Sequence, residues 1–228
     1  MTTPSALHGG VRAARQERTR TRLLDAAEEL FAERGFYGVG VRDITNHAGT
    51  RLAAVNDSFG GKENLFAEVL RRRIHPLNTA RRARLADVPR SGPRARRLHA
   101  VIDAFARPML DCAENPGWQH YFRLTAQLAN TRQPALILVA EDFNSIAADV
   151  IGQFRAIFPD ADEVALHDAY LYLVAATTNT FADTGRLDSL TQDRLHADDL
   201  HDRYASLLPF LGGGITRLAT TRLERHST

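Results

Sequence analysis

The chain has 228 residues, 44% hydrophobic and 25% charged, which suits a globular protein of one large or two small domains. The single cysteine, Cys112, excludes an internal disulfide and any metal site built from several cysteines. The sequence contains no run of 18 apolar residues and no signal-peptide core, so we expect a cytoplasmic protein without a membrane anchor.

Charge is divided unevenly along the chain. Residues 1–98 hold 18 Arg and Lys62 against ten acids, a net charge of +9, whereas residues 99–228 hold ten Arg against 17 acids, a net charge of −7. The use of 28 Arg and one Lys indicates a general bias toward Arg, but that bias does not explain the asymmetry. A basic first lobe predicts an anionic partner for that lobe.

Helical periodicity predicts four helices in the first lobe, after a polar, basic arm over residues 1–18 that is expected to be flexible. The helices are expected over residues 19–34, 41–47, 52–59 and 62–76. Gly35 is expected to close the first helix as a C-terminal cap. Glycines 60–61 are expected to break the third helix and Pro76 to stop the fourth, because neither residue type continues a helix well.

The second lobe follows a basic connector, RRARLADVPRSGPRARR, and is assigned residues 77–228. Its helices are predicted over residues 95–112, 118–130, 134–158, 162–183 and 198–211. Pro134 is a candidate first-turn proline, and the last helix is expected to kink at Pro209 or to end at the glycines 212–214. We find no convincing strand and no internal repeat, so the predicted fold class is all-α.

Residues 41–60 fit a helix-turn-helix. Thr45 is small enough for two helices to cross, Gly49 permits the turn, and Val55 can lock the second helix onto the first. A pair this short cannot fold alone, so the flanking helices must supply its core. In such a motif the second helix lies in the major groove of DNA. Taken alone, the pattern also fits an ordinary helical hairpin.

Three segments, LLDAAEELFAERGF, VRDITNHAGT and AAVNDSFGGKENLF, together resemble the DNA-binding domain of the tetracycline-repressor (TetR) family. The resemblance covers about Thr19 to Ile74 and is nearest to members whose turn reads A-A-V-N-Y-H-F-G-x-K-E. It implies an N-terminal helix-turn-helix domain over residues 19–76 and a helical ligand-binding and dimerisation domain over residues 77–228. The implied protein is not an enzyme.

The same resemblance implies how the protein works. A transcriptional regulator of this kind, expected to be a repressor, binds a palindromic double-stranded DNA operator as a homodimer. It releases the DNA when a small-molecule effector binds the second lobe. The helices over residues 162–183 and 198–211 of each subunit are expected to form the dimer interface as a four-helix bundle.

Positions that match the family are expected to contact DNA. These residues are Arg42, Thr50, Arg51, Leu52, Asn56, Ser58 and Lys62. Arg51 could read guanine and Asn56 adenine, although a phosphate contact suits either side chain equally well. Lys62 opens a helix, where its ammonium and the free helix N–H groups are expected to hold a phosphate.

Four positions depart from the family pattern. Asp57 and Ser58 stand where the subset has Tyr and then His, and Val39 and Gly40 stand where Ser or Thr usually precedes the second helix. Asp57 is expected to repel a phosphate. Basic residues of the arm and first turn are expected to compensate for this loss: Arg12, Arg15, Arg18, Arg20 and Arg22. Weaker or more salt-sensitive DNA binding is therefore expected; the alternative is a helical dimer that binds a ligand or protein and has weakened or lost DNA binding.

The second lobe holds candidates for a ligand pocket. They are Phe105, Met109, Trp118, Tyr121, Phe122, Phe143, Tyr170 and Phe181. Each also fits a plain core, and the stronger reason to expect a pocket is the family resemblance; an aromatic lining favours a hydrophobic or aromatic effector. The segment HADDLHD, residues 196–202, could bind a divalent metal, but its aspartates suit a helix N-terminus better. No catalytic residue, metal site or cofactor is assigned.

The departure at Asp57 gives a first prediction. Replacing it in Asp57→Tyr removes a negative charge near a phosphate, an effect on the order of 1 kcal/mol for an exposed group. Operator binding, measured by a titration with labelled duplex, should become tighter. Unchanged or weaker binding would count against a position of Asp57 at the phosphate backbone.

Overall fold

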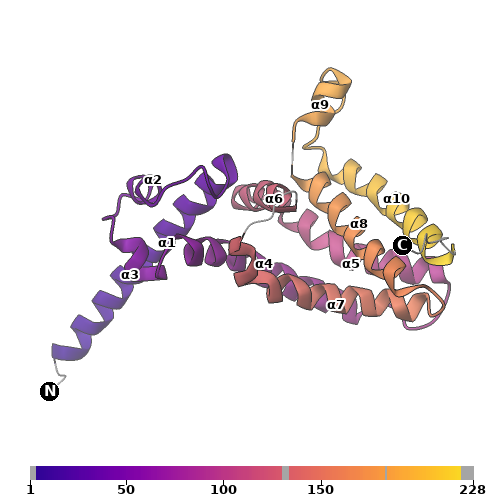
Figure 1. Cartoon of the computed structure of the whole chain (residues 1–228), viewed down its shortest axis with the longest axis horizontal. Helices are drawn as coiled ribbons and strands as arrows, with labels where there is room; N and C mark the ends of the chain where they lie inside the picture. Colours follow the sequence, from indigo (N-terminus) through magenta and orange to yellow (C-terminus); the bar gives the residue numbers. More distant parts are fainter. Residues whose placement is uncertain (1–3, 130–133, 183, 222–228) are drawn as a thin grey trace, which may run out of the picture. The chain divides into compact units, whose positions relative to one another are not determined.

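The computed structural model describes residues 4–129, 134–182 and 184–221, and every regular element within them is helical, so the all-α prediction is confirmed (Figure 1). The helices are α1 (Pro4–Arg34), α2 (Val41–His47), α3 (Ala54–Phe59), α4 (Lys62–Ala86), α5 (Arg94–Ala113), α6 (Pro116–Ala129), the 3₁₀ helix η1 (Pro134–Val139), α7 (Ala140–Ile157), α8 (Glu163–Phe181), α9 (Arg186–Thr191) and α10 (Leu200–Thr220). The chain divides into two compact units. One is Met1–Arg72 with Arg132–Val139, and the other is Arg73–Thr131 with Ala140–Thr228.

The core of the first unit is built on aromatic rings. Phe66 of α4 packs edge-on against Phe31 of α1, with ring centroids 5.1 Å apart, and against Phe36 at 4.9 Å. The predicted inward face of α1 is buried as expected: Leu23, Ala27, Leu30 and Phe31. These contacts give the two short helices α2 and α3 a surface on which to pack.

Helix α1 begins well before the predicted start at Thr19. Residues 4–18, expected to be a flexible arm, are helical and continuous with the rest of α1. This segment is rich in Ala, Arg, Gln and Glu, which favour helix, and an established helix extends at little cost once nucleated. From Gly10 to Arg18 the segment is exposed, so it adds a basic helical extension without adding core.

Pro76 does not stop α4, which runs on to Ala86 and crosses the division between the units. An interior proline removes one hydrogen bond and costs about 3 kcal/mol. Burial on one face offsets that cost, because Ile74, Leu77 and Leu85 are all buried. Part of the predicted basic connector therefore forms the last turns of a helix.

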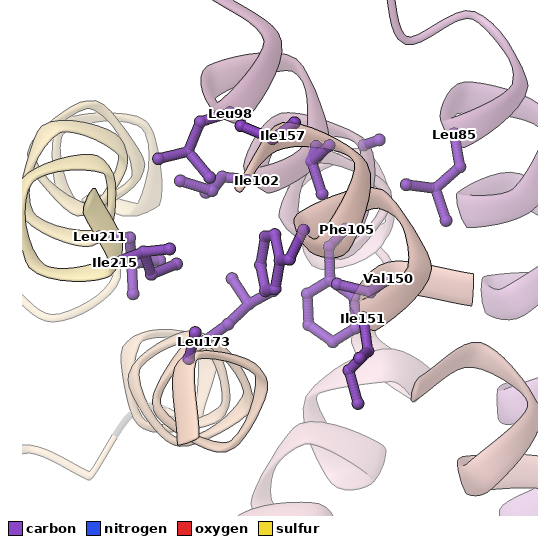
Figure 2. Packing of buried hydrophobic residues seen from close by; sticks show 14 of the residues in the cluster. Leu85, Leu98, Ile102, Phe105, Val150, Ile151, Ile157, Leu173, Leu211 and Ile215 are labelled. Carbon is purple, nitrogen blue, oxygen red and sulfur yellow. The ribbon is translucent and has the colours of Figure 1, made fainter. Parts of the chain in front are cut away.

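Helix α5 lies at the centre of the second unit. Figure 2 shows side chains of α5, α7, α8 and α10 converging on one interior, with Leu98, Ile102 and Phe105 contributed by α5. Leu173 comes from α8 and Leu211 from α10. These four helices thus form a bundle around a shared apolar core.

Two predicted helix boundaries in the second half of the chain differ from the structure. The helix expected from Pro134 begins as the 3₁₀ helix η1 and becomes α-helical only at Ala140. Helix α10 does not end at the glycines 212–214 but continues through Pro209 to Thr220. Leu211 and Ile215 are buried on either side of the glycines, so packing overrides the low helix propensity of glycine. Among the described residues, no helix combines the length and apolarity that crossing a membrane requires.

Candidate nucleic-acid interface

The turn between α2 and α3 depends on Gly49. Its φ of +59° lies in the left-handed region, which side chains other than glycine enter at a cost. The turn is closed by the Thr50 amide, which donates to the Thr45 carbonyl at 2.8 Å, and Thr45 itself is buried. The structure therefore confirms the helix-turn-helix geometry predicted from Thr45 and Gly49.

Helix α3 has only six residues, and its two sides differ sharply. Ala54, Val55 and Phe59 are buried. The residues expected to read DNA are exposed: Arg51, Leu52 and Asn56. Arg51 and Leu52 precede the first helical residue and belong to the turn rather than to the helix. Exposed Leu52 is consistent with a surface that contacts another molecule.

Arg20 of α1 holds the end of α3 in place. Its Nη1 donates to the Ser58 carbonyl at 3.1 Å, and its Nη2 pairs with Glu68 of α4 at 2.5 Å. Its guanidinium also lies 4.4 Å from the centroid of the Phe59 ring. Arg20 therefore joins three helices, and its expected compensation for Asp57 on the DNA stays a prediction.

Asp57 forms an ion pair with Arg51. Arg51 Nη2 donates to Asp57 Oδ2 at 2.7 Å, although the Arg51 side chain is 77% exposed. The carboxylate expected to repel a phosphate thus neutralises one of the candidate DNA-reading cations. An exposed pair is worth only about 0.2–1 kcal/mol, so DNA can compete for Arg51.

A groove of about 1250 Å³ lies between the first half of α1 and the turn and α3. It is lined by Val11, Arg12, Arg15, Gln16, Arg18, Thr19, Arg22, Gly49, Thr50, Arg51, Ala54, Asp57 and Ser58. Arg22 Nη2 donates to the Gly49 carbonyl at 3.0 Å and so fixes one end of the groove. The groove contains three of the predicted contact residues, Thr50, Arg51 and Ser58, and most of the compensating arginines.

The other predicted contacts lie outside this groove. Arg42 is exposed on α2, and Asn56 is exposed on α3. The ammonium of Lys62 lies 4.2 Å from the centroid of the Phe36 ring, and burial lowers its pKa while the neighbouring Glu63 and Asp43 oppose that shift. To contact a phosphate, the Lys62 ammonium would have to move off the Phe36 ring or to contact the ring and the phosphate at the same time.

The two departures before α2 have a structural explanation. Val39 is a buried core residue. Gly40 is the N-terminal cap of α2, and its amide donates to Asp43 Oδ2 at 2.8 Å, without a side chain that could bind the first free N–H groups. Stability is thus maintained by Asp43, while the hydroxyl that could have reached a phosphate is missing.

The candidate pocket residues of the second unit fall into groups. Trp118, Tyr121 and Phe122 of α6 stack together with ring centroids 5.7–6.0 Å apart, and Phe122 also meets Phe181 of α8 at 5.7 Å. Phe105 of α5 meets Tyr170 of α8 at 6.0 Å. Met109 is buried on α5, whereas Phe143 of α7 is half-buried and, within the described residues, has no ring contact with the others. These placements fit a core as well as a pocket wall.

The metal alternative at residues 196–202 has no support in the structure. His196 Nδ1 lies 3.2 Å from Asp188 Oδ1, in an exposed contact that joins α9 to the loop after it. In the described part of the chain, no three His, Cys, Asp or Glu side chains gather in a way that could hold a metal ion.

Comparison with known proteins identifies the fold. A family model described as bacterial regulatory proteins of the tetR family matches residues 23–69, and one described as the tetracyclin repressor-like C-terminal domain matches residues 103–214. The chain belongs to the TetR family. It is a DNA-binding transcriptional regulator, and the first family model covers α2, α3 and the turn between them.

Several TetR-family relatives are similar over different shares of the chain. The transcriptional repressor NicS of Pseudomonas putida is 25% identical over 178 residues, which is 73% of this chain and 77% of NicS. The transcriptional activator FasR of Mycolicibacterium smegmatis is 33% identical over 96 residues, 42% of each chain. The structure of FadR from Bacillus subtilis in complex with stearoyl-CoA has a TM-score of 0.60 and 14% identity, covering 85% of this chain and 98% of FadR.

The Arg51–Asp57 pair can be tested by a double-mutant cycle on DNA affinity. Asp57→Asn frees Arg51, so affinity should rise about two- to fivefold at low salt. In an Arg51→Met background the same change should have little effect, since no cation is released. Glu33→Gln, an exposed acid of α1, is the control for net charge. Equal effects of Asp57→Asn in both backgrounds would show direct phosphate repulsion instead.

Proposed function

We propose that this TetR-family protein is a repressor that binds a palindromic operator as a homodimer and leaves it when a small molecule binds the second unit. One observation carries the DNA part of the proposal. The side chains of Arg51, Leu52 and Asn56 are exposed beside a groove lined by arginines, while the opposite side of α3 is buried. The exposed side chains supply base or backbone contacts, and the groove supplies phosphate contacts.

The shortness of α3 supports a dimeric reader. Six helical residues reach only a few base pairs, too few for useful specificity. Two copies related by a two-fold axis read two half-sites, and such symmetry requires a palindromic operator. The arginines of the groove displace counterions from DNA, so affinity should fall steeply with salt concentration.

Exposed apolar side chains on α8 and α10 support a dimer interface on these helices, as the sequence predicted. Leu171 is 58% exposed and Phe210 is 71% exposed, and Val164 and Tyr172 of α8 are also exposed. Large apolar residues grouped on adjacent helices mark a protein interface more often than a free surface. The second copy would cover them in a four-helix bundle made from α8 and α10 of each subunit.

The second unit is proposed to bind the effector. Its interior carries the aromatic groups on α5, α6 and α8, and FadR, a protein of the same fold, is known in complex with stearoyl-CoA. The assignment as a repressor follows NicS, which matches over a larger share of this chain than FasR does. For release to occur, the effector must bind the DNA-free state more tightly than the DNA-bound state.

A footprint on the DNA upstream of the protein's own gene tests the DNA proposal. At low salt the protein should protect a two-fold-symmetric segment, and affinity should fall as salt rises. Arg15→Gln should weaken binding and reduce the salt dependence, whereas Arg90→Gln, an exposed arginine of the connector, should change neither. Absence of protection at low salt would instead favour a helical dimer that binds a ligand or protein and has lost the ability to bind DNA.

The dimer proposal has its own test by analytical ultracentrifugation. Leu171→Glu places a charge in the proposed interface and should raise the dimer dissociation constant at least tenfold, because a buried unpaired charge is costly. Ile137→Glu is the matched control, since Ile137 is equally apolar and 79% exposed but belongs to the first unit. If both variants remain dimeric, another surface forms the interface.

A further inference from the structure

A buried guanidinium lies in the interior of the second unit. Arg81 of α4 is only 7% exposed. Its Nε donates to the Phe105 carbonyl at 2.9 Å, and its Nη1 donates to Asn78 Oδ1 at 3.3 Å. Its Cζ lies 3.8 Å from the centroid of the Phe105 ring. All of these partners are electrically neutral.

Arg81 differs from the arginines that follow it on the same helix. Arg82 pairs with Asp149 at 2.9 Å, and Arg84 pairs with Asp111 at 2.8 Å. Over residues 4–129, 134–182 and 184–221, no carboxylate forms an ion pair with Arg81, although buried charges in proteins are usually paired. Burial lowers the pKa of Arg81 to about 10, so the group still carries its charge at neutral pH.

A purely structural role explains only part of this arrangement. Pro108 lies inside α5 and lacks the amide hydrogen that would bond the Ala104 carbonyl, and beside that position Arg81 Nε donates to the Phe105 carbonyl. This structural contact uses Nε alone. It does not explain why a positive charge lies in the interior of the unit, and in the described part of the molecule Nη2 donates to no protein acceptor.

The side chains around Arg81 suit the body and the head of an amphipathic acid. Tyr121 and Tyr170 interact electrostatically with Arg81, and burial raises the pKa of Tyr170. Phe105 packs against Tyr170, so the guanidinium borders an aromatic wall. A carboxylate matches the planar fork of a guanidinium, and a charge-assisted pair is strongest away from water.

We propose that Arg81 anchors the acidic group of the effector, which is therefore an organic carboxylic acid with an apolar or aromatic body. This inference rests on the proposed control by a small molecule and narrows the effector from any hydrophobic compound to an acid. The acid supplies the negative charge that the interior around Arg81 lacks, and the rings of Phe105 and Tyr170 contact the apolar body.

Paired acids and amides test the proposal on the full-length protein without DNA. Phenylacetate is compared with phenylacetamide, and decanoate with decanamide, by calorimetry. At least one acid should bind tenfold or more tightly than its amide. Arg81→Met should abolish that preference, Arg81→Lys should keep part of it, and Arg82→Met, at the exposed neighbouring arginine, should leave it unchanged. Tyr170→Phe provides a second variant, and it should weaken acid binding several-fold with less effect on the amide.

The outcomes separate this inference from the proposed function. Acids that bind no better than their amides, including the case in which neither binds, would overturn it, as would an acid preference that survives in both Arg81→Met and Tyr170→Phe. DNA binding is measured separately on the same proteins. If the unmodified protein shows no acid preference but binds its operator, only the role of Arg81 is contradicted, whereas acid preference without operator binding contradicts only the proposed repressor.

Discussion

The DNA-reading part of this protein depends on how a six-residue helix is held. A helix as short as α3 would not be stable alone in water, because its few hydrogen bonds do not offset the conformational entropy lost on nucleation. Val55 and Phe59 bury its inner side, Gly49 sets the turn before it, and Arg20 fastens its end to α1 and α4. The outward side of α3 is not needed for packing, so its side chains can contact a partner.

The pairing of Arg51 with Asp57 changes what the departures from the family pattern mean. From its charge alone, an acid on the side proposed to face DNA would be expected to weaken DNA binding. In the structure it pairs with a long, exposed arginine that is itself a candidate DNA contact. Because the pair neutralises one positive charge, non-specific attraction of this surface to phosphates should be weaker.

The sequence predicted the all-α class, the helix-turn-helix and its buried residues, because periodicity and glycine positions report local structure directly. It failed where packing outweighs local preference, as at Pro76 and the glycines 212–214, which lie inside helices. Burial of Arg81 was missed because its neighbours in sequence are exposed arginines. A signal did exist, since Ile74, Leu77, Arg81 and Leu85 follow one helical face across Pro76. The contacts of Arg20 with Ser58 and Glu68 join residues that are 38 and 48 positions apart, and no local sequence pattern reveals them.

We expect the turn at Gly49 and the outer side of α3 to meet the DNA together with the basic extension of α1. Amide hydrogen exchange with and without a duplex from the upstream region measures this directly. Exchange should slow over residues 11–22 and 49–62 when the duplex is present, and the core of α5 should be unaffected. Duplex bound at the same concentrations with exchange unchanged in both segments would show that another surface binds the DNA.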